Sequence, residues 1–288
     1  MIFDIWFLIY LVNDMNKMLK IGIVGCGAIG GSLAGIIKKD LAGKAKITGL
    51  YDIDGAKAAG LSRSLCGSGR LAAGDLKQLI ARSDLVIEAA SAAHSWGIAR
   101  QALGARKDIM IMSVGGIVTH AAELRRLARK NKSRVFIPSG AIAGIDGLKA
   151  SSAVKIKKVV LTTRKNPRSF TGVAYIRDRK IDLEAIHKDT VLFSGSAKDA
   201  TVLFPQNINV AAVLSLAGIG AAKTEVRIIA SPDTQNNIHE IEIESSAGKI
   251  FTRTENVLHP ENPKTSYLAV LSAAAALRQI VEPVRIGT

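Results

Sequence analysis

Short apolar runs and longer stretches of helical periodicity alternate along the first half of the chain. The strand-like runs lie at residues 19–25, 46–51, 84–89, 108–113 and 134–138. The helical stretches lie between them, at residues 28–37, 54–65, 74–81, 92–103 and 120–130. Strands that alternate with helices in this way are typical of βαβ units, whose strands form a parallel sheet. The pattern therefore predicts an α/β domain over residues 19–138.

The pattern changes after Pro138, where longer strand-like runs follow one another with fewer helices. These runs lie at residues 157–164, 223–230, 236–245 and 249–254. A stretch rich in Gly and Ala at 139–148 leads into a helix. Further helices are expected at 197–204 and 207–217, and a long alanine-rich helix at 266–284. Runs of strands of this kind predict a second, mostly antiparallel α+β domain over residues 139–264.

Composition narrows the class of protein. The chain has 288 residues, of which 48% are apolar and 22% charged, and this excludes a disordered, collagen-like or coiled-coil protein. The net charge of +15 raises a nucleic-acid hypothesis. The basic residues are scattered, without interleaved aromatics or a basic tail, so we expect a solvated basic surface and no nucleic-acid partner. A milder functional interpretation is a field that attracts anionic substrates.

The N-terminus and the cysteines give no sign of a membrane span, a disulfide framework or a zinc site. Residues 1–12 are apolar except for Asp4, but a bilayer span needs about 20 such residues. We therefore interpret residues 1–18 as an N-terminal extension and expect no membrane partner. Cys26 and Cys66 cannot build a disulfide framework, and zinc-ligand spacings are absent. The prediction is a cytoplasmic protein without a metal site.

A glycine-rich motif joins the first strand to the first helix. Residues 25–30 (GCGAIG) match GxGxxG in the strand–turn–helix context that a dinucleotide site requires. Gly25 would allow the tight turn, Gly27 the approach of the pyrophosphate, and Gly30 the close packing of helix on sheet. Ala28 and Ile29 belong to the same cofactor-binding loop, whose helix N-terminus offers N–H groups to phosphate.

Asp52 ends the second strand, 22 residues after Gly30. A carboxylate there suits the ribose hydroxyls of NAD and repels the 2′-phosphate of NADP. We predict NAD as the cofactor, with NADP as an alternative because Arg63 and other cations lie nearby in sequence. The stretches 88–91 and 113–116 end two further strands at the same edge. Their small residues either leave room for the bound cofactor or belong to ordinary turns between a strand and a helix.

Four strings in the second half carry a family resemblance. They are FPQNINVAA at 204–212, NNIHEI at 236–241, ENPKTS at 261–266 and SGAIAG at 139–144. With the GxGxxG motif, the chain resembles the L-aspartate dehydrogenase family from about residue 19 to its end. The resemblance implies a Rossmann domain at 19–138, completed by a C-terminal helix at 265–288, with an inserted α+β substrate domain at 139–264.

The resemblance also implies an activity. It implies oxidation of L-aspartate to iminoaspartate with NAD or NADP, or the reverse amination of oxaloacetate with ammonia. The step would stand at the start of NAD biosynthesis, with a quinolinate synthase as the consumer of the imine. We also expect a homo-oligomer, namely a dimer. By motif, the family's catalytic histidine falls on His239 and its cofactor contacts on Ala143 and Asn209.

The residues themselves support part of this assignment. Oxidation at an amine carbon needs a group that accepts a proton near neutral pH, which histidine does. His239 lies on an alternating strand, whereas His94 and His120 look like helix starts and His187 like a helix end, all three structural. His259, in the loop before the last helix, is left open as a neighbour of the site.

Two groups of polar residues have alternative interpretations. Asn207 and Asn209 flank a helix start and fit N-caps as well as a nicotinamide contact. Lys264, Thr265 and Ser266 precede the last helix and fit either its cap or a site for a substrate carboxylate. Two rival functions remain at this point: another two-domain NAD(P)-dependent reductase, and a non-catalytic dinucleotide sensor that would not need His239.

Overall fold

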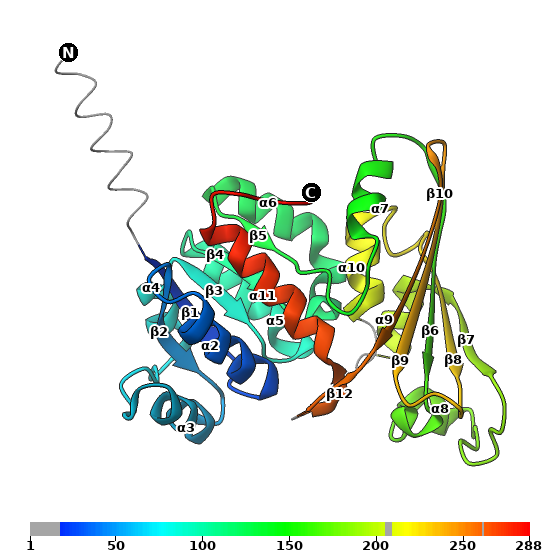
Figure 1. Cartoon of the computed structure of the whole chain (residues 1–288), viewed down its shortest axis with the longest axis horizontal. Coiled ribbons are helices and arrows are strands. Elements are labelled where there is room, and N and C mark those ends of the chain that lie inside the picture. Colours follow the sequence, from blue (N-terminus) through cyan, green and yellow to red (C-terminus); the bar gives the residue numbers. More distant parts are fainter. Residues whose placement is uncertain (1–17, 205–208, 261) are drawn as a thin grey trace.

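Two sheets lie side by side in the computed structural model, which describes residues 18–204, 209–260 and 262–288 (Figure 1). The first sheet has the strand order β2-β1-β3-β4-β5, and all its neighbouring strands are parallel. Its strands are β1 (Leu19–Val24), β2 (Ala45–Tyr51), β3 (Leu85–Glu88), β4 (Asp108–Ile111) and β5 (Val135–Phe136). The predicted α/β domain is therefore present, with its strands in the expected places.

Helices cover both faces of the first sheet, as the alternating pattern requires. They are α2 (Ala28–Asp40), α3 (Gly55–Cys66), α4 (Leu76–Arg82), α5 (Ala92–Gly104) and α6 (Ala121–Asn131), with the 3-10 helix η1 (Val114–His120) before α6. Asp54 and Asp75 cap α3 and α4 with their carboxylates. Such caps satisfy N–H groups that the first turn of a helix leaves without partners.

The direction of the strand order changes between β1 and β3. From β1 the chain goes to β2 on one side, and β3, β4 and β5 follow on the other side. Ligands of open α/β sheets bind beyond the carboxyl ends of the strands at such a switch point. Here those ends lead into the glycine-rich loop after Val24 and into the turn after Glu88.

The second sheet is mixed, with the order β10-β9-β6-β8-β7. Three of its four neighbouring pairs are antiparallel and β6 runs parallel to β8, so the expected mostly antiparallel sheet is confirmed. Its strands are β6 (Ile156–Lys165), β7 (Thr190–Ser196), β8 (Glu225–Ala230), β9 (Asn237–Ser245) and β10 (Gly248–Asn256).

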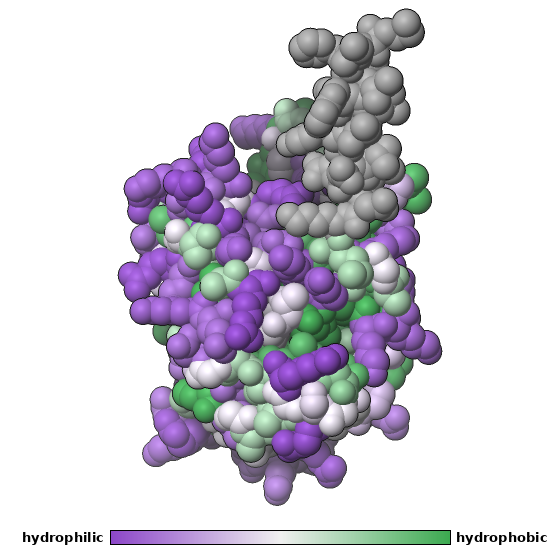
Figure 2. Space-filling model, turned by 90° about the vertical axis from the view of Figure 1, so that its left-hand side faces the viewer, coloured by the Kyte–Doolittle hydropathy of each residue, from purple (hydrophilic) through white to green (hydrophobic). Residues whose placement is uncertain are grey.

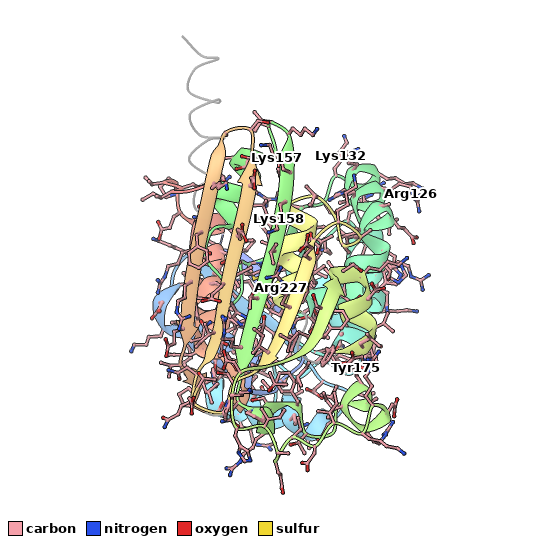
Figure 3. The ribbon with its side chains drawn as sticks, turned by 90° about the vertical axis from the view of Figure 1, so that its right-hand side faces the viewer. Arg126, Lys132, Lys157, Lys158, Tyr175 and Arg227 are labelled. Atoms are coloured by element: carbon pink, nitrogen blue, oxygen red, sulfur yellow. The ribbon has the colours of Figure 1, made fainter. Side chains whose placement is uncertain are left out.

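Helices lie on one face of this second sheet, on the side of the first domain (Figure 1). They are α7 (Ile145–Ser151), α9 (Ala197–Leu203) and α10 (Asn209–Ala217), while α8 (Ala174–Asp178) and η2 (Pro167–Phe170) lie near one end of the strands. Buried side chains of α7, α9, α10 and β9 form one core cluster. Figure 3 looks onto the opposite, outer face, where Lys158 of β6 and Arg227 of β8 are labelled.

The last helix, α11 (Tyr267–Val281), returns to the first domain. Its Val270, Ala273 and Leu277 are buried in the same cluster as β1 and α2. The helix is shorter than the expected 265–288. At its C-terminal end Glu282 precedes Pro283 and is extended, because proline disfavours a helical conformation in the residue before it. The exact domain boundaries, 138/139 and 264/265, stay a prediction.

Several local expectations were wrong. Residues 190–196, where the pattern indicated no strand, form the edge strand β7, and residues 262–266, which the pattern placed directly before the last helix without a strand, form β12 (Asn262–Ser266), which pairs with β11 (Leu258–His259). His187 lies outside any helix.

The expected extension at 1–18 lies outside the described residues except for Met18. No helix in the described ranges is long and apolar enough to cross a membrane.

The surface on one side of the molecule is mostly hydrophilic. Figure 2 shows the face on the side of the first sheet, where hydrophilic side chains cover most of the area and hydrophobic ones gather near the middle. Within the part of the chain that the structure describes, no three His, Cys, Asp or Glu side chains are grouped so that they could hold a metal ion.

Candidate active site

The glycine-rich loop has the geometry that each of its three roles requires. Gly25 has a φ of 95°, and a Cβ there would lie 2.4 Å from the carbonyl oxygen of Ala89. A Cβ on Gly30 would lie 1.9 Å from the carbonyl oxygen of Gly25. A Cβ on Gly27, by contrast, would meet no atom within 4 Å. Two glycines are thus needed for packing, whereas Gly27 leaves open space at the start of α2.

Asp52 is tied directly to that loop. Its Oδ2 accepts a hydrogen bond of 2.7 Å from the backbone N–H of Cys26, and its Oδ1 accepts one of 2.9 Å from the N–H of Asp54. Burial, with a contribution from Asp52, raises the pKa of the Cys26 thiol to about 12. The thiol therefore stays protonated at neutral pH, which is the state expected of a loop residue and not of a nucleophile.

The side chain of Glu88 links the end of β3 to the end of β4. It is fully buried, and its carboxylate accepts hydrogen bonds from the N–H groups of Ala90 and Ser113, each 2.9 Å long, and from the Ser95 hydroxyl. Burial raises its pKa. The sequence analysis did not single out its side chain, which fastens the turn after β3 to the end of β4.

A cavity lies where the two domains meet. The first domain contributes Ile29 of the glycine motif, and Met112 and Val114, which follow β4 in the chain. The second contributes His239 and Asn237 of β9, Lys165 of β6 and Asn209 of α10; Thr265 and Ser266 of β12 complete the wall. The structure therefore brings together five predicted site residues that are spread over more than two hundred positions: Ile29, Asn209, His239, Thr265 and Ser266.

His239 is 4% exposed and lies on the inner face of the second sheet. Its Nδ1 is 3.0 Å from the hydroxyl of Thr163, the residue opposite it on β6. Burial, and next the positive charge of Lys165, lowers the pKa of His239 to about 3. The imidazole is therefore neutral at physiological pH and held in a fixed orientation by Thr163.

Two asparagines position the elements around the cavity. The Oδ1 of Asn209 accepts a 3.0 Å hydrogen bond from the N–H of Gly115 in η1 and so links α10 to the first domain. The amide of Asn237 donates to the Ser266 hydroxyl over 3.3 Å. Ser266 occupies the N-cap position of α11 but makes no side-chain cap hydrogen bond. Its hydroxyl thus binds another residue of the cavity wall and does not cap the helix.

Lys165 was missed by the sequence analysis. It is 7% exposed, lines the same cavity as His239, and burial lowers its pKa to about 8. A signal was present in the sequence, since Lys165 follows Thr163 by two positions and the two share one face of β6. The residues around Lys165 are all polar, so the sequence did not indicate which face of this part of β6 would be buried.

Other candidates lie elsewhere or outside the described residues. Ala143 is exposed and lines a different groove, and its carbonyl accepts a hydrogen bond from the Thr252 hydroxyl. Gly140 and Ala141, in contrast, line the cavity. His259 packs against α2, 3.0 Å from the Ser32 hydroxyl, and lines a separate pocket. Asn207 and the side chain of Lys264 fall among the residues that the structure does not describe. The roles predicted for Ala143 and Lys264 stay predictions.

His94 and His120 have structural surroundings. The Nδ1 of His94 is 3.0 Å from the Ser91 hydroxyl in the first turn of α5. His120, at the start of α6, stacks on Trp96 with 4.5 Å between the ring centroids. Neither lines the cavity between the domains.

Known families match both parts of the chain. Residues 25–138 match the family described as homoserine dehydrogenase, NAD binding domain, and residues 146–280 match aspartate dehydrogenase, C-terminal. The L-aspartate dehydrogenase of Methanosarcina barkeri is 45% identical over 273 residues, covering 94% of this chain and 100% of its own length. The L-aspartate dehydrogenase of Nitrosopumilus maritimus is 38% identical over 274 residues with the same coverage.

Solved structures agree with these matches. The crystal structure of an aspartate dehydrogenase from Thermotoga maritima superposes with a TM-score of 0.74 at 28% identity, covering 94% of this chain and 100% of its own. A homoserine dehydrogenase from Thiobacillus denitrificans superposes with a TM-score of 0.59 at 13% identity, over 92% of this chain and 74% of its own. The second match shows the fold alone.

Proposed function

This chain belongs to the aspartate dehydrogenase family, and from that premise we propose that it oxidises L-aspartate to iminoaspartate, which water converts to oxaloacetate and ammonia. The observation that carries the proposal is the cavity between the domains, where His239 and Asn209 face the glycine motif through Ile29. A non-catalytic sensor would need the motif but not a buried, oriented histidine beside it.

The residues at the first sheet fit a nicotinamide dinucleotide. Gly27 leaves space at the N-cap of α2, and no side chain caps this helix, so its first N–H groups are available to a pyrophosphate. Asp52 lies beside the loop, and carboxylate oxygens that each accept one N–H have capacity left for ribose hydroxyls. Gly25, Gly27, Ala28, Ile29, Gly30 and Asp52 would hold the cofactor there.

The chain's own residues then have three tasks: to place the substrate Cα, to take up a proton and to hold the carboxylates. When bound, the nicotinamide ring supplies the acceptor for the hydride that leaves Cα. His239 is neutral in the substrate-free chain, which is the state that a proton acceptor needs, and we assign to its ring the proton that leaves the amino group. Because Thr163 meets Nδ1, the other ring nitrogen is left for the substrate or for a water molecule.

Asn209 and the pair Thr265–Ser266 would complete the site. Asn209 uses its carbonyl oxygen for Gly115, so its NH₂ group is left to contact a nicotinamide amide. Thr265 and Ser266 lie at the start of α11, a 15-residue helix whose N-terminus favours an anion such as a substrate carboxylate.

A panel assay tests this function. Purified protein is incubated with NAD or NADP and, one at a time, L-aspartate, L-glutamate, L-alanine and L-homoserine, and formation of the reduced cofactor is recorded. We expect turnover with L-aspartate well above the others, and reduced-cofactor consumption when oxaloacetate and ammonia are supplied. Cofactor binding without turnover of any substrate would favour a sensor, and turnover of another substrate alone would favour a different reductase.

We also propose a cytoplasmic homodimer that supplies NAD biosynthesis. The outer face of the second sheet supports the dimer, because helices lie only on its other face among the described elements (Figure 3). Phe251 of the edge strand β10 is 68% exposed. Light scattering should give twice the chain mass of 30.5 kDa, and a monomer at micromolar concentration would contradict this part of the proposal.

A further inference from the structure

A buried carboxylate lies at the carboxyl end of β3. Glu88 is fully buried and is the last residue of that strand. Its Oε1 accepts a 2.9 Å hydrogen bond from the N–H of Ala90, and its Oε2 accepts one of 2.9 Å from the N–H of Ser113. The Ser95 hydroxyl donates to Oε2 over 3.2 Å. One side chain thus joins the turn that follows β3 to the turn that follows β4.

The turn after β4 reaches the cavity between the domains. Glu88 accepts the N–H of Ser113 in this turn. The residues on either side of the serine, Met112 and Val114, line the cavity together with His239. The place of these two side chains in the cavity wall therefore depends on a residue that does not itself line the cavity.

The same turn carries a link to the second domain. The N–H of Gly115 donates to the side chain of Asn209 on α10. A Cβ on Gly116 would lie 2.0 Å from the carbonyl oxygen of Ala92, so the turn also lies directly against the start of α5. A shift of this turn would therefore move the cavity wall and the partner of Asn209 together.

The glycine loop has supports of its own. The N–H of Ala89 donates to the carbonyl oxygen of Val24 over 2.8 Å, and Gly25 packs against Ala89 so closely that a Cβ would not fit. Asp52 holds the loop from the other side. None of these contacts uses the side chain of Glu88, so we expect the loop to keep its shape when that side chain is exchanged.

The strand order gives the two halves of a dinucleotide different places. The order β2-β1-β3-β4 puts Asp52, after β2, on one side of the glycine loop and the two turns joined by Glu88 on the other side. The adenosine ribose belongs at Asp52 and the pyrophosphate at the start of α2. The nicotinamide half is then left with the ends of β3 and β4, next to the cavity that His239 lines.

We propose that Glu88 is a positioning residue for the nicotinamide half of the cofactor. Through its two backbone partners it holds the turns after β3 and β4 where the ring needs them, and because it is fully buried it does so without touching the ring. This inference rests on the dinucleotide site of the proposed function and adds a residue that acts on one half of the cofactor. Exchange of the carboxylate should weaken binding of the nicotinamide half and leave the adenosine half in place.

Two ligands separate the halves. NADH carries both, whereas ADP carries the adenosine and two phosphates and lacks the nicotinamide half. Their affinities are measured by calorimetry for wild type and Glu88→Gln. Glutamine has the same size, but its NH₂ group cannot accept, so one backbone N–H loses its acceptor. NADH should bind about tenfold more weakly to this variant, while ADP affinity stays unchanged.

Two fully buried serines, one beside each end of β3, give a matched control. Ser95→Ala removes the hydroxyl that donates to Glu88, and it should weaken NADH binding in the same direction but by less, with ADP affinity unchanged. Ser83→Ala removes a hydroxyl that donates to the carbonyl oxygen of Leu79 over 2.7 Å, just before β3. It should change neither affinity, whatever it costs in stability.

Three results would overturn the proposal. One is wild-type NADH affinity in Glu88→Gln. Another is an equal loss of affinity for NADH and ADP in that variant, which is expected of a residue that only supports the fold. The third is a selective loss of NADH affinity in Ser83→Ala, since any weakening of the first domain would then produce the effect. If Glu88→Gln does not fold, Ser95→Ala decides, and wild-type NADH affinity in Ser95→Ala overturns the proposal.

Failure of this inference and failure of the proposed function give different results. Wild type that oxidises L-aspartate and keeps its NADH affinity in Glu88→Gln leaves the dehydrogenase intact and removes the role of Glu88. Wild type that oxidises no L-aspartate, but whose NADH affinity falls selectively in Glu88→Gln, removes the dehydrogenase and keeps that role. Wild type that binds no NADH contradicts both.

Discussion

His239 is buried beside a buried lysine, so the folded chain keeps its imidazole neutral far below the pH at which a free histidine takes up a proton. Its pKa is about 3 in the folded chain and about 6.5 in the unfolded chain. Between these values the unfolded chain binds a proton that the folded chain does not, so the free energy of unfolding falls as the pH falls through this window.

This linkage gives a prediction for stability. The free energy of unfolding in urea is measured at about pH 7 and about pH 5 for wild type and for His239→Gln, whose amide keeps a partner for Thr163. Wild type should lose about 2 kcal/mol more than the variant between the two pH values. Equal losses would show that His239 protonates freely in the folded chain and is not held neutral by its surroundings.

Asp52 carries the prediction on cofactor choice. Its carboxylate lies at the end of β2 beside the glycine loop, where a 2′-phosphate would meet a negative charge. Wild type should therefore have a lower KM for NAD than for NADP, and Asp52→Asn should narrow the difference. A lower KM for NADP in wild type would mean that nearby cations such as Arg63 decide the choice.

Some of the candidate site residues could be recognised in the sequence and others could not, for physical reasons. Gly25, Gly27 and Gly30 were predictable because their spacing itself reports a backbone requirement. His239 was recognisable from its string. Lys165 and Glu88 were not, because their importance comes from burial, and the burial of a charged side chain depends on elements far away in the sequence.

At the scale of elements, hydrophobic periodicity predicted the βαβ half well, since its strands are buried on both faces and bounded by clear turns. It failed for β7, an edge strand in which Val191 is exposed, and for β12, whose Asn262-Pro263 start indicated a turn. Both strands exist because a neighbouring strand pairs with them, which local sequence does not report.

The start of α2 gives a prediction for this element. Gly30→Ala puts a Cβ against the backbone of Gly25 and should cost about 1–3 kcal/mol of stability or prevent folding. Gly27→Ala meets no atom and should fold as wild type does, yet bind NADH at least tenfold more weakly, because the methyl group occupies the space needed by the pyrophosphate.

Thermal unfolding and an NADH titration check the two variants side by side. The contrast is informative because both exchanges add the same methyl group three residues apart on one helix start. Normal NADH affinity in Gly27→Ala would place the pyrophosphate elsewhere. Wild-type stability in Gly30→Ala would mean that α2 moves away from the loop without cost.

At the scale of the whole molecule, the cavity between the domains exists only because the chain returns to the first domain. Residues after β5 leave the first domain, form the second sheet, and come back through β12 and α11 to pack on α2. His239 on β9 and Ile29 on α2 thereby line one cavity. The pattern of elements predicted two domains, but the juxtaposition of their residues required the fold.

We propose that His239 performs the proton transfer of aspartate oxidation in this cavity. The measurement is turnover at saturating L-aspartate and NAD for wild type and His239→Ala, with NADH affinity as the control for folding. We predict a fall of about 10²–10⁴-fold in turnover with NADH affinity nearly unchanged, since the cofactor phosphates and ribose are assigned to Gly27 and Asp52. If His239→Ala keeps more than about a tenth of wild-type turnover, the barrier has risen by less than about 1.4 kcal/mol, and His239 is then structural and does not transfer the proton.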